Sequence, residues 1–131
     1  DEATEMMVAA NSFRDSGDKE RAIEGYKKTL SRFPKRLEAA YNLAYILATD
    51  KDIKVRRPRE SRALALRLCQ MTNNKNPNYL DLLSMAEASC GNFESAILAV
   101  TEAIKLYENR SDVSSAKLRL ELYHSKKIFI K

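Results

Sequence analysis

The residues best able to do chemistry in this chain are one histidine and two cysteines. His124 stands near the end of the last expected helix, where a positive charge interacts favourably with the helix dipole. Cys69 and Cys90 fall near the ends of two successive antiparallel helices, about 10–15 Å apart at the usual rise per residue. That separation exceeds the reach of a disulfide, and one histidine with two separated thiols cannot form an ordinary zinc site. We therefore expect buried free thiols, a structural histidine and no bound metal.

Other signatures of catalysis are missing from the sequence. Neither a phosphate-binding loop nor a dinucleotide fingerprint occurs. The acidic residues are scattered over expected helix surfaces, where solvated charge is the ordinary role. We expect a non-catalytic chain that uses no cofactor, although another part of a longer protein could carry an activity.

A basic stretch over residues 51–59 is the strongest candidate for binding an anion. Phosphate, an anionic lipid headgroup or an acidic protein could meet its positive charges. The interpretation that we favour is an ordinary solvated loop, in which Asp50 and Asp52 cap helices and pair with some of the arginines. Nucleic acid is not favoured, because no aromatic residue for base stacking lies between Tyr45 and Tyr79. The basic residues are Lys51, Lys54, Arg56, Arg57 and Arg59.

Composition predicts one small helical domain over residues 1–131. The chain is 44% hydrophobic and 31% charged, with a net charge of +5. Its 3 Gly and 3 Pro provide too few turns for a β meander. No apolar run approaches the roughly 18 residues that span a membrane. The chain starts at Asp1 without Met or a signal pattern, so we expect a segment of a longer protein.

The helices that position these residues are predicted by an internal repeat. In Gly17–Leu30 and again in Gly91–Ile104, a glycine is followed five residues later by Ala and then Ile. A helical run precedes each glycine and another follows it, which predicts helix–turn–helix hairpins. We expect hairpins over about 3–34, 37–76 and 77–109, and a seventh, capping helix over about 112–125. Met6, Ala9, Ala10 and Phe13 form the apolar stripe expected to face inward from the first helix.

Such hairpins cannot bury their apolar faces alone, so they stack on one another. The predicted fold is therefore an all-α solenoid of three hairpins and a capping helix. The polar side of the last helix would close the stack.

These residues resemble the tetratricopeptide repeat (TPR), a helix–turn–helix unit of about 34 residues. The second hairpin departs from the pattern, because Ser61 replaces the usual Ala and its turn is about five residues longer. With that longer turn, the chain is similar to a TPR subtype common in large bacterial proteins. The first hairpin matches through Ala10, Phe13, Gly17, Ala22, Tyr26 and Pro34, and the third through Leu83, Gly91, Ala96 and Ala103.

The resemblance implies a right-handed superhelix whose first helices line a concave groove for a peptide or partner protein. Met7, Asn78 and Leu82 stand where some members of the family carry the bases of a carboxylate clamp, so we predict no such clamp. For each groove residue the alternative is ordinary solvated helix surface. The groove candidates are Met7, Asn11, Arg14, Asn42, Tyr45, Ile46, Asn78, Leu82 and Met85.

The function expected is a protein–protein interaction module. The alternative is a structural or self-assembly segment whose end faces or tail pair with copies of itself. The tail, residues 126–131, either folds back over the last helix or contacts the rest of the protein or another chain. The compartment also stays open between the cytoplasm and an extracytoplasmic domain of a larger bacterial protein.

Overall fold

The computed structural model describes residues 1–131 and contains seven helices and no strand. This confirms the prediction of an all-helical chain with about seven helices. The helices are α1 (Glu2–Asp15), α2 (Lys19–Arg32), α3 (Leu37–Thr49), α4 (Pro58–Met71), α5 (Pro77–Ser89), α6 (Phe93–Leu106) and α7 (Arg110–His124).

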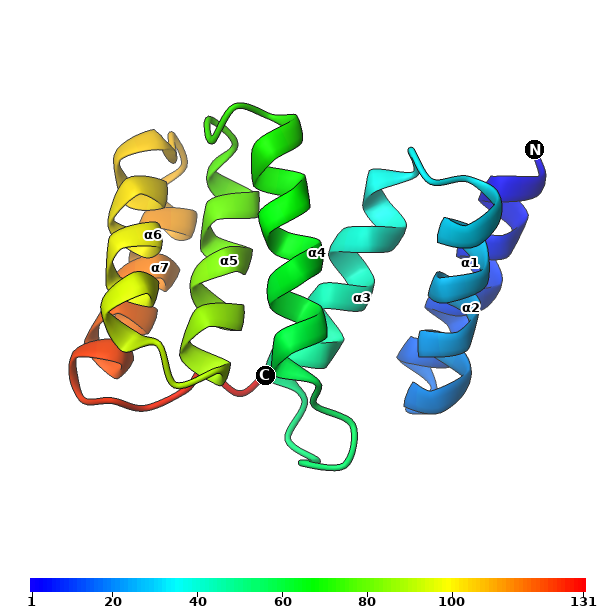
Figure 1. Cartoon of the computed structure of the whole chain (residues 1–131), viewed down its shortest axis with the longest axis horizontal. Helices are drawn as coiled ribbons and strands as arrows, with labels where there is room; N and C mark the ends of the chain where they lie inside the picture. The colour runs from blue at the N-terminus through cyan, green and yellow to red at the C-terminus, as the bar shows by residue number, and fades with distance from the viewer.

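Each helix packs against the next along the chain, and α3 also packs against α5. The helices follow one another along the long axis, from α1 and α2 at one end to α6 and α7 at the other (Figure 1). Side-chain hydrogen bonds link the odd-numbered helices: Asn42 donates to Asn11 over 3.3 Å, and the Ser84 and Tyr123 hydroxyls lie 3.3 Å apart. We call α1, α3, α5 and α7 the odd-helix row.

The turn between α1 and α2 is built as the sequence predicts. Gly17 has φ of +88°, a left-handed conformation that costs glycine little. The Asp18 side chain then accepts a hydrogen bond from the Arg21 amide at 3.2 Å and caps α2. Farther along, Gly25 lets the two helices approach closely, since a Cβ there would lie 2.9 Å from the Cβ of Ala10.

Two details of the predicted helices are corrected. The sixth helix ends at Leu106 rather than near residue 109, and α7 begins at Arg110 rather than near 112. The reason is that Asn109 caps α7, accepting the Ser111 amide at 2.7 Å. Ser111 and Asp112 therefore lie inside the first turn of α7.

The buried face of α1 also differs from the predicted stripe. Ala3, Met7 and Ala10 are buried, whereas Ala9 is exposed and Met6 and Phe13 are only partly buried. The buried face is displaced by about one residue, and Met7 and Ala10 pack in one core cluster with residues of α2 and α3. On α3 the residues Ala40, Leu43, Ala44 and Leu47, spaced as on one face of a helix, are all buried.

None of the seven helices combines the length and apolarity needed to cross a bilayer. Three or more His, Cys, Asp or Glu side chains are nowhere grouped as a metal site would require. Cys69 and Cys90 are both free thiols, the first buried and the second half-buried. His124 lies exposed in the last turn of α7.

Candidate functional site

Four of the nine groove candidates belong to the hydrophobic core. Met7, Ile46, Leu82 and Met85 are each 5% exposed or less. The prediction that these side chains line a surface is wrong. Helices α3 and α5 have neighbours on several sides, so residues beside the predicted stripe are also buried.

Three of the remaining candidates, Asn11, Arg14 and Asn42, form a polar network with Tyr26. The Tyr26 hydroxyl donates to Asn11 Oδ1 at 2.5 Å, and the same oxygen accepts from Asn42 at 3.3 Å. Arg14 reaches the Tyr26 hydroxyl at 3.4 Å. Burial raises the pKa of Tyr26, so its hydroxyl remains a donor at neutral pH. Part of the hydrogen-bonding capacity of Asn11 and Asn42 is therefore used within the fold.

An open hollow of about 680 Å³ lies at the carboxyl ends of α1 and α3. At its edge the Lys19 ammonium contacts the Asp50 carboxylate at 3.1 Å. Burial opposes ionisation of Asp50, but the Asp52 amide and Lys19 outweigh it and hold the pKa of Asp50 below its usual value. The hollow is lined mainly by polar and charged side chains, among them Arg14, Lys19, Tyr45, Thr49, Asp50, Lys51 and Lys131.

The tail, residues 126–131, folds back past α7 and reaches α3. From the end of α7 it runs past the carboxyl end of α5 and ends near the carboxyl end of α3 (Figure 1). The Lys131 amide donates to the carbonyl of Thr49 at 3.0 Å. Phe129 packs against two core clusters, one containing Leu82 and the other Tyr123. Part of the face expected to be free is thus covered by the chain itself.

Cations lie over aromatic rings at two points of this contact. The guanidinium of Arg119 lies 5.2 Å from the ring centre of Phe129, and the ammonium of Lys131 lies 5.3 Å from that of Tyr45. Both distances are within the range of cation–π attraction. We call the surface that holds residues 126–131, with contacts at Tyr45, Thr49 and Arg119, the tail seat.

A buried ion pair fixes one side of the tail seat. Arg119 on α7 donates through Nε to Asp81 on α5 at 2.9 Å and also contacts the second carboxylate oxygen. The Tyr107 hydroxyl donates to Asp81 at 2.8 Å, and its pKa is raised by burial and by that carboxylate. The sequence reasoning missed this pair, for which the one available signal was an aspartate within an otherwise apolar stretch of α5.

Stacked tyrosines support the other side of the tail seat. The rings of Tyr41 and Tyr45 are stacked at 6.3 Å, and Tyr79 lies tilted against Tyr41 at 6.1 Å. Burial raises the pKa of Tyr41 to about 12 and also raises the pKa of Tyr45, so these two side chains stay neutral. Asn78, the last groove candidate, is exposed at the start of α5.

No family model and no curated protein matches this chain. Proposals about its role therefore depend on its own residues and their geometry.

Most cations of the basic loop, residues 51–59, form neither an ion pair nor a hydrogen bond. Arg56 donates to the Asp50 carbonyl at 2.7 Å, while Lys51, Lys54, Arg57 and Arg59 are exposed and form no ion pair. The expectation that Asp50 and Asp52 pair with the arginines is wrong. The Asp50 carboxylate pairs with Lys19, and each aspartate accepts an amide within the loop.

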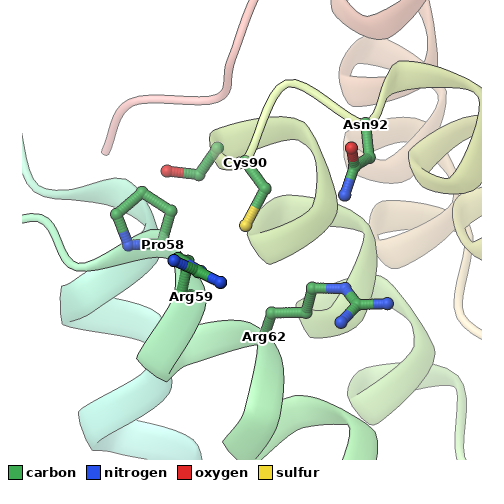
Figure 2. Close-up of a pocket in the computed structure, with 6 residues that line it drawn as sticks. Pro58, Arg59, Arg62, Cys90 and Asn92 are labelled. Carbon is green, nitrogen blue, oxygen red and sulfur yellow. The ribbon is translucent and has the colours of Figure 1, made fainter.

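Arg59 also borders a pocket of about 640 Å³ between the start of α4 and the end of α5 (Figure 2). Arg62 and Asn92, which also line it, both bond to the buried carboxylate of Glu87, at 2.6 and 3.1 Å. Burial and Glu87 raise the pKa of Cys90, so its thiol is protonated at neutral pH and is a poor nucleophile. The pocket therefore offers one unpaired cation, Arg59, beside a neutral thiol.

Proposed function

We propose that this chain is a TPR-like, right-handed α-solenoid that binds an extended segment of a partner protein along its odd-helix row. Three consecutive helix pairs and a final single helix support this interpretation, as do the side-chain bonds that join α1 to α3 and α5 to α7. Such a row presents one continuous surface to a ligand.

The observation that carries the proposal is the course of the tail. Residues 127–131 have no helix or strand of their own, yet they lie across the row and bond to the carbonyl of Thr49. The row therefore accommodates an irregular polypeptide segment. The hollow between α1 and α3 continues this surface and leaves room for a longer one.

The test is selection from a random peptide library displayed on phage, with the full chain as bait. We expect peptides of micromolar affinity that slow hydrogen exchange in α3 and α5. Tyr45→Ala should weaken them about tenfold, whereas Leu98→Ala, on an exposed residue of α6, should leave them unchanged. Enrichment of no peptide, or protection confined to another surface, would refute the proposal.

A second candidate function is the binding of an acidic partner by the basic loop. The exposed, unpaired cations at Lys51, Lys54, Arg57 and Arg59 favour it. Replacing Lys51 and Lys54 by Gln should then abolish binding of a polyglutamate probe, and raising the salt concentration should weaken it steeply. Binding that persists in 0.5 M salt, about three times physiological ionic strength, would argue against this function.

A further inference from the structure

The tail is held to the body by few polar contacts. After α7 the chain turns at Lys126, whose φ is +55°, and the Lys127 amide donates to the Leu122 carbonyl at 2.9 Å. From there to the end, the bond from Lys131 to Thr49 is the single hydrogen bond between tail and body, and no ion pair joins them. A segment held in this way can leave its seat without breaking a hydrogen-bond network.

The contacts that receive the tail are fixed by other parts of the body. Arg119 is oriented by Asp81, and Tyr45 is stacked on Tyr41. The Thr49 carbonyl belongs to the last turn of α3. None of these supports involves residues 126–131.

The fit of the tail is incomplete. A hollow of about 750 Å³ remains between the tail and α7, lined in part by Leu118, Leu122, Ile128 and Ile130. Leu118 is 65% exposed and Ile130 is 40% exposed. A segment with larger apolar side chains at these positions would bury surface that the tail leaves in water.

We propose that residues 126–131 are an internal ligand, and that the partner segment recognised at the tail seat carries the same chemical pattern. That pattern is an aromatic residue between two aliphatic ones, followed by a basic residue. The aromatic ring lies beneath Arg119, and the basic side chain lies over Tyr45. This inference rests on the proposed function and adds the chemistry of the partner and its competition with the tail.

The experiment uses a fluorescein-labelled, amidated peptide of residues 125–131 and fluorescence polarisation. Two variants open the seat: deletion of residues 126–131, and Phe129→Lys in the full chain, which places two cations together. The matched control is Ile53→Lys, on an exposed apolar residue of the loop after α3. A peptide with Lys in place of Phe controls for non-specific binding.

We expect the peptide to bind both opened variants at least about tenfold more tightly than it binds the full chain or Ile53→Lys. Adding Tyr45→Ala to Phe129→Lys should remove the gain. Equal affinities for all chains would overturn the proposal. So would loss of the helical circular dichroism signal in both opened variants, since the tail would then be part of the core.

Two outcomes separate this proposal from the proposed function. Library peptides that bind the opened and full chains equally, without competition from the tail peptide, would overturn the internal ligand and leave the function standing. A dimer that forms only when the tail is present would also overturn it, because a second copy would then be the occupant.

Discussion

Replacing Arg119 by Met tests how much the buried ion pair between Arg119 and Asp81 stabilises the fold. The Asp81 side chain is 3% exposed and that of Arg119 is 12% exposed. Removing the guanidinium leaves a buried carboxylate with only hydroxyl donors, from Tyr107 and Ser84. Loss of one partner from a buried pair costs about 3–5 kcal/mol, which for a chain of this size lowers Tm by about 10–15 °C.

Urea unfolding followed by circular dichroism measures this cost. The double variant Asp81→Asn/Arg119→Met removes both charges and should recover most of the loss, because neutral groups of similar size need no counter-charge. Arg110→Met, on an exposed residue of the same helix without an ion pair, should change stability by less than about 0.5 kcal/mol. A loss below about 1 kcal/mol for Arg119→Met, or a double variant as unstable as the single one, would refute the reasoning.

Three further predictions concern stability. Gly25→Ala should destabilise the chain in urea, because overpacking against Ala10 costs about 1–3 kcal/mol and exceeds the gain of about 1 kcal/mol in helix propensity. Adding Ala10→Gly to this variant should restore stability. A Gly25→Ala variant more stable than the parent chain would contradict the prediction. Asn109→Ala should cost about 1 kcal/mol through loss of the cap on α7, with Ser114→Ala as a control of little effect. Burial raises the pKa of Cys69 from 9.0 to about 11, so the thiol ionises in the unfolded chain at a lower pH than in the folded one. The free energy of unfolding should therefore fall by about 1–3 kcal/mol between pH 9 and pH 11. Unfolding curves of Cys69→Ala should lack that part of the fall, and an identical pH dependence would disprove the raised pKa.

Local interactions made much of the helical framework predictable. The turn predicted at Gly17 is present, with Gly17 in the left-handed conformation, and Asp18 caps α2 as its residue type indicates. The limits predicted for the first hairpin, about 3–34, agree with those of α1 and α2, which together span residues 2–32. These features depend on residues within about four positions of one another, and such spacing can be read from the chain alone.

The candidate site was predicted less well. Asn11, Arg14, Asn42, Tyr45 and Asn78 reach the surface, but four apolar candidates do not. The periodicity of one helix shows which residues share a face. It does not show how many neighbouring helices cover that face, and for α3 and α5 the number decides which side chains are buried.

By itself, the sequence determined the number of helices, most of their limits and the turn at Gly17, because backbone hydrogen bonds and caps form between near neighbours. Only the tertiary structure decided that Asp81 pairs with Arg119, 38 positions away, and that the tail crosses the odd-helix row to reach Thr49. Both contacts depend on how far each helix turns and shifts against the next. Those displacements come from the packing of all seven helices, and no short stretch of the chain encodes them.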